Sequence, residues 1–457
     1  MDAIICSAGQ GTRLGALGFY MRKSMFRDLH TDKSILWYQL DALQEGGVER
    51  VIILHPRVDH QIPAEVKRIE ERFPGMNLCC VPVETKNICE TVAVGLRYVH
   101  SDRVLRLDGD VCIPDRTGLL NLKAVSGNGL AYFTPVEDGQ INDHTVVITA
   151  DNRLEYWRPG QEDVPRIWSC IEIWNRSDLT RLIHDPEVAD LSMFYQRVNV
   201  FAGKNPPIIW TPVEIPATYE IDTPEDLRLL MDFWDRRARE KEKSALRFWT
   251  RQQRYPSFSV DKMAQLRRDI ELVSALLGQG EKILEIGAGE GRLMRELLVR
   301  NSPSRYRVVE PNPWYLSHIR ETFRDCPNVD TFQGTLEDWN MRPEGQEDPD
   351  DVALALGWAI YLIHDETLHR NLFSLNARRL ILKDSEPPQD RYSRLMVDHF
   401  SREVGEHYIA LYRSVTEMCS ILRHSGWLVR EIHREIYPPE LDSRYGNRAY
   451  LLVAERP

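Results

Sequence analysis

Apolar runs alternate with amphipathic segments over the first 230 or so residues. The apolar runs predict buried strands, and the segments between them show the 3.6-residue spacing of helices. Strands are expected at 3–6, 51–54, 78–83 and 104–107, and helices at 35–44, 64–73 and 89–99. Because strand and helix alternate, we expect a parallel sheet with helices on both faces.

The pattern changes after residue 130. Strand runs now follow one another at 130–133, 145–149, 154–157, 167–174 and 208–215. We expect a mixed extension of the sheet here, which would cover a ligand. Thr223 and Pro224 then suit a helix N-cap and first position. The helix is expected to continue into the charged run at 236–243 as a solvated bridge.

A second α/β series begins at Lys282. Its strands are expected at 283–286, 306–309, 329–332, 352–356, 379–382, 428–432 and 449–453. Only a loop separates the last two, which predicts an antiparallel hairpin at the sheet edge. The chain is therefore predicted to have α/β domains at 1–240 and 262–457, joined by a helical linker at 241–261.

The composition fits a protein that folds around large cores. Of 457 residues, 42% are hydrophobic and 28% are charged, and the net charge is −11. This acidic balance gives no electrostatic footprint for nucleic acid or an anionic membrane, and no apolar run is long enough for a membrane span. No signal peptide is recognised, and the eight cysteines lack zinc spacing. We expect a cytoplasmic protein with reduced cysteines that acts on small molecules; its oligomeric state stays open, a homodimer being one option.

A glycine-rich turn follows the first strand. Its residues are Ala8, Gly9, Gln10, Gly11, Thr12 and Arg13. Such a turn lets backbone N–H groups approach a polyphosphate without obstruction by side chains. Arg13 and Lys23 would add positive charge where pyrophosphate leaves. The alternative is a plain strand-to-helix loop.

Carboxylates occur at two further places. Asp108 and Asp110 follow the fourth strand, and the carboxyl ends of parallel strands face the ligand crevice of an open α/β sheet. Glu220 and Asp222 would emerge together on one side of an extended segment. A hard cation such as Mg²⁺ fits this chemistry because it accepts one or two carboxylates plus phosphate oxygens. The alternative is a solvated turn rich in Asp and Gly.

The stretch from Ser7 to Leu14 resembles the nucleotidyltransferase family that activates sugars and small phospho-alcohols, whose pattern is A-A-G-x-G-[TS]-R-L followed by Pro-Lys. Ser7 replaces the first alanine here, and Arg22 replaces the proline before Lys23. The resemblance covers about residues 1–235. It implies a Rossmann-like (GT-A-like) mixed sheet with Asp110 at the metal-binding position, while Asp108 would support it.

The segment at 220–227 is more similar to phosphocholine and phosphonate cytidylyltransferases than to most sugar-1-phosphate enzymes. The resemblance implies Mg²⁺ on Asp110 and Asp222, with catalysis by these two residues, Arg13 and Lys23. In such relatives the segment after the third strand binds the base, which implies the nucleotide contacts Lys86, Glu90 and Thr91 and a preference for CTP. The aromatic residues that could either form a box for a quaternary amine or belong to the core are Tyr156, Trp157, Trp168, Trp174 and Tyr219.

A second glycine-rich turn, at 287–291, follows the strand at 283–286. Glu310 ends the next strand, where an acid can accept hydrogen bonds from both hydroxyls of a ribose. Residues 262–457 resemble the class I S-adenosylmethionine-dependent methyltransferases, which implies a seven-stranded fold. The implied cofactor contacts are Glu285, Gly287, Gly289, Gly291, Glu310, Glu337 and Asp338, the last two near the adenine.

Methyl-acceptor candidates follow the fourth strand of this series. They are Tyr361, His364 and Asp365. The His364 imidazole could take a proton from an amine or hydroxyl, or His364 could simply begin a helix beside Asp365. Residues 384–415 look like an insertion over the mouth of the site, and the candidate lid residues there are Tyr392, His399 and Tyr408.

We therefore interpret the chain as a bifunctional enzyme. The first domain would transfer CMP from CTP to a small phosphate or phosphonate of the phosphocholine, phosphoethanolamine or aminoethylphosphonate type, releasing pyrophosphate. The second would methylate the same molecule or its CMP derivative with S-adenosylmethionine. Two alternatives stay open: a sugar-1-phosphate nucleotidyltransferase fused to a sugar methyltransferase, and a non-catalytic nucleotide sensor.

Overall fold

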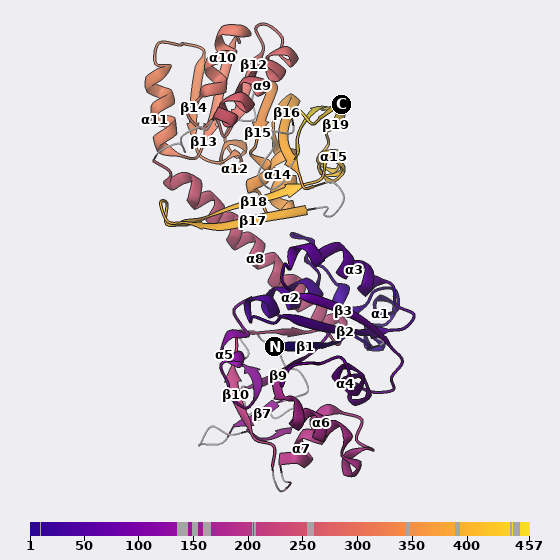
Figure 1. Ribbon diagram of the computed structural model, residues 1–457. Coiled ribbons are helices and arrows are strands. Elements are labelled where there is room, and N and C mark those ends of the chain that lie inside the picture. The colour runs from indigo at the N-terminus through magenta and orange to yellow at the C-terminus, as the bar shows by residue number, and fades with distance from the viewer. Residues whose placement is uncertain are drawn as a thin grey trace. The chain divides into compact units, whose positions relative to one another are not determined.

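A computed structural model of the chain forms two compact units (Figure 1). The first comprises Met1–Leu29 and Lys33–Phe233, and the second comprises His30–Asp32 and Trp234–Pro457. The structure describes residues 1–9, 11–134, 145–148, 154–158, 166–202, 204, 207–253, 260–343, 348–388, 394–438, 441 and 448–457. Within these ranges no helix is long and apolar enough to cross a membrane. The eight cysteines all lie in them, and each is a free thiol.

The first unit is built on one mixed sheet. Its strands are β1 (Asp2–Cys6), β2 (Arg50–Pro56), β3 (Asn77–Val83), β4 (Arg103–Asp108), β6 (Asn128–Phe133), β7 (Thr145–Ile148), β8 (Leu154–Arg158), β9 (Ile167–Asn175) and β10 (Trp210–Glu214). The path across the sheet is β10-β6-β9-β4-β1-β2-β3, with β7 and β8 added beside β9. The four expected strands β1 to β4 are parallel, and β9 pairs antiparallel with β4. The mixed extension is thereby confirmed.

The helices of the first unit include four that the sequence pattern did not predict. They are α1 (Ala16–Tyr20), α2 (Ile35–Glu45), α3 (Gln61–Ile69), α4 (Ile88–Leu96), α5 (Leu120–Lys123), α6 (Arg176–His184) and α7 (Phe194–Ala202). Helices α2 to α4 overlap the expected ones. Helices α6 and α7 lie where only strands were expected, and α6 buries Leu179, Leu182 and Ile183 at helical spacing.

Strand register brings the glycine-rich turn after β1 and the Asp108–Asp110 turn after β4 to the same edge of the sheet. Cys6 ends β1 and pairs with Asp108, which ends β4. The Gly109 N–H donates to the Cys6 carbonyl at 2.9 Å. The short strands β5 (Val111–Cys112) and β11 (Tyr219–Glu220) pair antiparallel, and the Ile221 N–H donates to the Asp110 carbonyl at 3.1 Å. The segment after β11 therefore reaches the same edge.

The second unit contains a seven-stranded sheet. Its strands are β12 (Lys282–Ile286), β13 (Arg305–Glu310), β14 (Val329–Gln333), β15 (Asp350–Leu356), β16 (Ala377–Glu386), β19 (Leu428–Arg434) and β20 (Arg448–Glu455), in the order β14-β13-β12-β15-β16-β20-β19. The expected antiparallel pairing of the last two strands is confirmed. However, β20 also pairs antiparallel with β16, so only β19 lies at the edge.

Helices pack on both faces of this sheet. They are α9 (Val260–Leu276), α10 (Arg292–Arg300), α11 (Pro313–Thr322), α12 (Leu336–Asn340), α14 (Asp365–Ser374) and α15 (Val415–His424). Successive strand residues point to opposite faces. Leu284 and Ile286 accordingly join a core with α14 and α15, whereas Ile283 joins a core with α9, α10 and α11.

Helix α8 (Pro224–Arg251) crosses the boundary between the units. Contacts assign it to the second unit from Trp234 onward, so this unit begins inside the helix and not after a linker at 241–261. Ala238 and Ala245, two turns apart, are buried with residues of β18 (Glu406–Arg413) and the loop before α14. β18 pairs antiparallel with β17 (Arg394–Ser401) inside the expected insertion.

The contact between the turns after β1 and β4 can be tested at Gly109. A Cβ there would lie 1.9 Å from the Ser7 Oγ and 2.6 Å from its Cα. We expect Gly109→Ala to lower the free energy of unfolding of the first unit by about 1–3 kcal/mol, since backbone must shift. Urea unfolding of the full chain measures this. Gly127→Ala, where a Cβ meets nothing within 4 Å, is the control, and equal stability of the two variants would contradict the prediction.

Candidate functional site

The first candidate site is a cavity of about 670 Å³ at the shared edge of the first sheet. Its wall contains most of the predicted residues of this unit. They are Gly9, Gly11, Thr12, Arg13, Lys23, Lys86, Asp108, Asp110 and Asp222. Ala8 lies in the same turn, and Gln10 lies outside the described residues.

Lys23 joins the two predicted metal ligands. Its Nζ lies 2.8 Å from Asp110 Oδ2 and 2.6 Å from Asp222 Oδ1. Arg13 Nη1 lies 2.5 Å from the other Asp222 oxygen. Burial alone would lower the pKa of Lys23, but the charges of Asp110 and Asp222 raise it above its usual range. The four residues predicted to be catalytic thus meet at one point.

Glu220 adds a third carboxylate that the sequence analysis placed on this side without giving it a role. One oxygen each from Asp110, Glu220 and Asp222 lie within 4.8 Å of one another. Burial raises the pKa of Glu220 to about 8, and the charges of Asp110 and Asp222 add to the shift. Oxygen donors of this kind suit a hard divalent cation such as Mg²⁺.

Arg106 is a further residue that sequence reasoning missed. Its side chain is 1% exposed within β4, and its Nη1 lies 3.0 Å from Glu172 Oε1 on β9. Its Nη2 donates to Asp108 Oδ1. Burial raises the pKa of Asp108 to about 6 although Arg106 opposes the shift. Arg106 therefore orients the Asp108 carboxylate from within β4. The sequence signal for this contact was a cationic residue inside an apolar strand run.

The predicted base-binding segment divides into two parts. Lys86 lines the cavity. Glu90 Oε2 accepts a hydrogen bond from the Lys86 N–H at 2.8 Å, and the buried Thr91 hydroxyl contacts Thr85 Oγ1 at 2.7 Å. Neither Glu90 nor Thr91 is in the cavity wall; both instead fix the turn that enters α4.

The five candidate aromatic residues do not share one surrounding. Trp168 lines the cavity. Trp174 is buried and packs edge-on against Phe194 and Trp210, and Tyr219 packs against Phe233. The side chains of Tyr156 and Trp157 lie outside the described residues. Of the described three, only Trp168 is placed to contact a ligand.

The second candidate site is a cavity of about 530 Å³ at the carboxyl ends of β12, β13 and β15. Four of the residues predicted to contact the cofactor line this cavity. They are Gly287, Gly289, Glu310 and Glu337. Gly289 has a φ of +55°, which favours glycine. Its N–H donates to Glu310 Oε2 at 2.9 Å, and the Asn312 N–H donates to Glu310 Oε1 at 2.9 Å. Burial raises the pKa of Glu310 to about 7, although both hydrogen bonds oppose the shift.

Three predicted cofactor residues support this cavity from outside its wall. Glu285 is buried and accepts a hydrogen bond from the Tyr306 hydroxyl at 2.6 Å. Gly291 has a φ of +71° and precedes α10. Asp338 accepts from the Thr335 N–H and hydroxyl, each at 2.8 Å, and so caps α12. Glu337 remains the acid of this turn that lies in the cavity wall.

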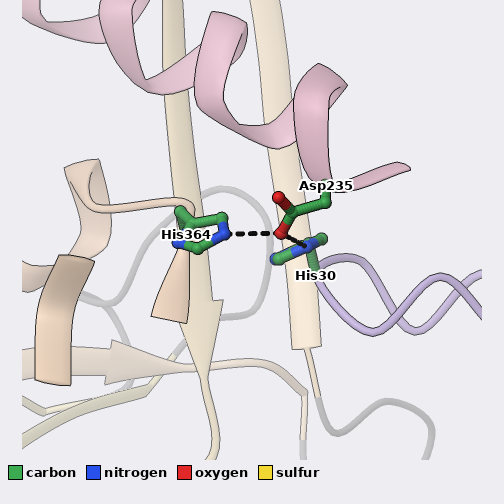
Figure 2. Close-up of side chains that lie close together, drawn as sticks. All are labelled: His30, Asp235 and His364. Atoms are coloured by element: carbon green, nitrogen blue, oxygen red, sulfur yellow. Dashed lines mark hydrogen bonds and ion pairs between the residues drawn. The ribbon is translucent and has the colours of Figure 1, made fainter. Parts of the chain in front are cut away.

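The methyl-acceptor candidates differ in whether they line the cavity. Tyr361 lines the cavity. His364 precedes α14 without a side-chain cap, and its Nε2 lies 2.5 Å from Asp235 Oδ1. His30 Nε2 lies 3.4 Å from the same oxygen, and its ring stacks on His364 (Figure 2). Neither His364 nor Asp365 is in the cavity wall.

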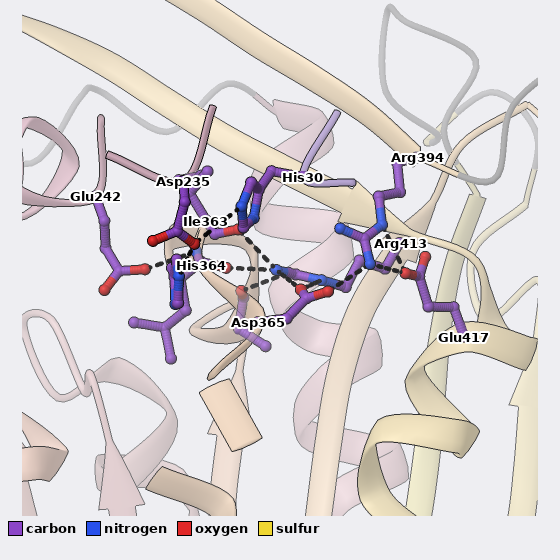
Figure 3. Close-up of polar contacts among 11 residues, drawn as sticks. His30, Asp235, Glu242, Ile363, His364, Asp365, Arg394, Arg413 and Glu417 are labelled. Carbon is purple, nitrogen blue, oxygen red and sulfur yellow. Dashed lines mark hydrogen bonds and ion pairs between the residues drawn. The ribbon is translucent and has the colours of Figure 1, made fainter. Parts of the chain in front are cut away.

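Asp365 belongs to a buried ion-pair network. Arg413 is fully buried and donates to Asp365 Oδ1 from Nη2 at 2.9 Å and to the Leu362 carbonyl at 2.6 Å (Figure 3). Arg394 pairs with Asp365 and Glu417. The network fastens the β17–β18 pair to the loop that carries Tyr361. His399 and Tyr408 lie on that strand pair, 4.9 Å apart between ring centroids, and Tyr392 lies outside the described residues.

Helix α8 contributes side chains to the second cavity, three of them from the charged run at 236–243 that was expected to face solvent. They are Arg239, Glu242, Lys243, Leu246 and Trp249. The expectation of a solvated face is confirmed for Arg239 and Lys243, which are exposed, and was wrong for the half-buried Glu242. The available signal was the helical spacing of Ala238, Glu242, Ala245 and Trp249, which begins within the charged run and continues past it.

Residues 2–153 match the sequence model of a family described as "Nucleotidyl transferase". No curated protein matches the chain. Among solved structures, the chain is similar to the inositol-1-phosphate CTP transferase from T. maritima, with 15% identity, a TM-score of 0.42 and coverage of 51% of this chain and 96% of that one. It is also similar to the CTP:phosphocholine cytidylyltransferase from Streptococcus pneumoniae, with 18% identity, a TM-score of 0.40 and coverage of 51% and 98%. The family match lies within the first unit and ends at residue 153.

Glu285 makes the stability of the second unit depend on pH. Burial raises its pKa to about 7, opposed by the Tyr306 hydrogen bond, against an ordinary value of 4.5. Between these values the folded unit binds more protons than the unfolded chain, so its stability falls as pH rises. We expect the free energy of unfolding of Glu285→Gln to decrease by about 3 kcal/mol less than that of the wild type as pH rises through this range.

Urea unfolding of the full chain at pH 5 and pH 8 measures the difference. Glu321→Gln, at an exposed position on α11, is the control. A Glu285→Gln protein with the pH dependence of the control would contradict the prediction.

Proposed function

We propose that the first unit transfers a cytidylyl group from CTP to a small phosphate or phosphonate, with Mg²⁺ and release of pyrophosphate. The observation that carries the proposal is the meeting of Lys23, Asp110 and Asp222 beside a glycine-rich turn. The family match supports the general class of reaction. The preference for CTP rests on the sequence resemblance at 86–91 and 220–227.

The chain's own residues suffice to organise such a reaction. Backbone N–H groups of Ala8, Gly9, Gly11 and Thr12 would hold the phosphates. An acceptor oxygen would attack the α-phosphorus in line with the departing pyrophosphate. Arg13 and Lys23 would stabilise the charge that the pyrophosphate acquires. Asp110 and Asp222, with Glu220 beside them, would hold Mg²⁺, which supplies further positive charge to the phosphates when bound.

We propose that the second unit transfers a methyl group from S-adenosylmethionine to the same small molecule or to its CMP derivative. The Glu310 carboxylate would accept hydrogen bonds from the ribose hydroxyls. The turn at 287–289 would lie against the cofactor, and the turn at 334–337 would lie at its base. The preferred substrate is an amino-alkyl phosphate or phosphonate, because one such molecule offers an oxygen for the first reaction and a nitrogen for the second.

Pyrophosphate release tests the first activity. With Mg²⁺ and phosphocholine, phosphoethanolamine or 2-aminoethylphosphonate, we expect release from CTP and not from UTP, GTP, ATP or dTTP. Asp110→Asn and Asp222→Asn should each lower kcat/KM by roughly 10²–10³-fold, because charge stabilisation at the phosphates is lost. Asp102→Asn, at an exposed position, is the control. Release with glucose-1-phosphate alone would instead favour nucleotide-sugar synthesis.

Calorimetric titration tests the second activity. We expect the full chain to bind S-adenosylmethionine, and Glu310→Ala to weaken binding by roughly 30–100-fold, which corresponds to two lost hydrogen bonds. Glu321→Ala on the neighbouring helix is the matched control. Unchanged affinity in Glu310→Ala would remove the predicted ribose contact, and absence of binding by the wild-type chain would remove the methyltransferase proposal.

A further inference from the structure

Three aromatic rings form a corner beside the second cavity. The Trp249 and Tyr361 ring centroids lie 5.0 Å apart with planes at 61°, and Tyr408 lies 6.2 Å from Trp249 and 6.1 Å from Tyr361. The three planes are thus steeply inclined to one another, and each side chain is only half-buried. Trp249 and Tyr361 belong to the cavity wall. We call these three residues the aromatic corner.

Glu242 brings a carboxylate to the same cavity. It lies seven residues before Trp249 on α8, so the two side chains share a helix face. Glu242 Oε2 accepts a hydrogen bond from the His364 N–H at 2.8 Å (Figure 3). This bond fixes the carboxylate beside the loop that carries Tyr361.

Among the described carboxylates of the cavity wall, Glu242 and Glu310 form no ion pair, and Glu310 is already held by two backbone N–H groups. Arg239 pairs with Asp235, Lys243 with Glu240, and Arg370 with Glu337. Within the part of the chain that the structure describes, Glu242 forms no ion pair and receives neutral donors. The wall therefore offers a partly compensated negative charge beside the half-buried rings of Trp249 and Tyr361.

We infer that Glu242 and the aromatic corner bind an alkylammonium group, and hence that the methyl acceptor of the second unit is an amine. Aromatic faces attract a cation through their quadrupole, and a carboxylate adds to this attraction. A neutral alcohol could donate a hydrogen bond to Glu242, but it would lack the charge attraction that both the carboxylate and the rings give a cation. The inference rests on the proposed methyltransferase function, which it makes specific.

The charge balance of methyl transfer agrees with this assignment. The bound ammonium would first release a proton to solvent. The neutral nitrogen would then form the new bond to the methyl carbon with its lone pair, and the sulfonium sulfur would keep the electrons of the broken carbon–sulfur bond. Positive charge therefore passes from sulfur to nitrogen. The product is an alkylammonium ion, which the aromatic corner and Glu242 would stabilise.

Binding of choline to the full chain saturated with S-adenosylhomocysteine tests the inference. The matched probe is 3,3-dimethyl-1-butanol, which replaces the charged nitrogen of choline by carbon at nearly the same shape. Titration calorimetry should show choline binding at least tenfold more tightly than this neutral probe. Equal affinities would overturn the inference.

Variants locate the bound choline. Glu242→Gln and Trp249→Leu should each weaken choline binding at least tenfold while the affinity for S-adenosylhomocysteine changes less than twofold. The controls are Glu240→Gln, on an exposed turn of the same helix, and Trp314→Leu, which is 42% exposed. Both should bind choline like the wild type.

The remaining outcomes separate the two proposals. A chain that does not bind S-adenosylhomocysteine overturns the methyltransferase function and this inference with it. A chain that binds S-adenosylhomocysteine but keeps its choline affinity in Glu242→Gln and Trp249→Leu overturns the inference alone. Loss of choline binding in Asp222→Asn but not in Glu242→Gln places the ammonium site in the first unit and likewise overturns it.

Discussion

Carboxylates at the ends of buried strands need donors or cations that compensate their negative charge, and both candidate sites depend on this constraint. In the first unit, three carboxylates approach within 4.8 Å of one another. Like charges at such distances disfavour ionisation unless cations lie among them, and Lys23 supplies one from an adjacent segment. In the second unit, Glu310 is compensated by two backbone N–H donors and no cation contacts it among the described residues.

This difference decides how each site can work. Lys23 and Arg13 hold the carboxylates of the first site together and are also the charges that would face a departing pyrophosphate. Their position is therefore coupled to the negative charges of Asp110 and Asp222. The N–H groups that hold Glu310 belong to turns fixed by strand register, so its carboxylate is oriented by the fold itself. The first site is organised by charge, and the second by backbone geometry.

The elements of the fold were predictable because each obeys a local rule. Strand runs in both units and the antiparallel pairing of the last two strands follow from hydrophobic period and loop length. The same rules place Asp110 and Glu310 at strand ends. They cannot show that Arg106 pairs with Glu172, 66 residues away, or that Asp365 faces Arg413 instead of a substrate, because these pairings depend on tertiary packing. Helix α6 was missed because its short apolar stripe lies within a strand-rich region.

Helix α8 shows why a charged run can hide a binding surface. Its composition predicts solvent exposure, yet Ala238, Glu242, Ala245 and Trp249 recur at helical spacing on one face. The two alanines are buried, which allows the helix backbone to approach its neighbours closely. That approach carries Glu242 and Trp249 to the cavity wall. Within the charged run, Glu242 is one more charged residue, and charge alone predicts that it faces solvent. Its place on the same helix face as Ala238 and Ala245 instead makes it part of the cavity wall.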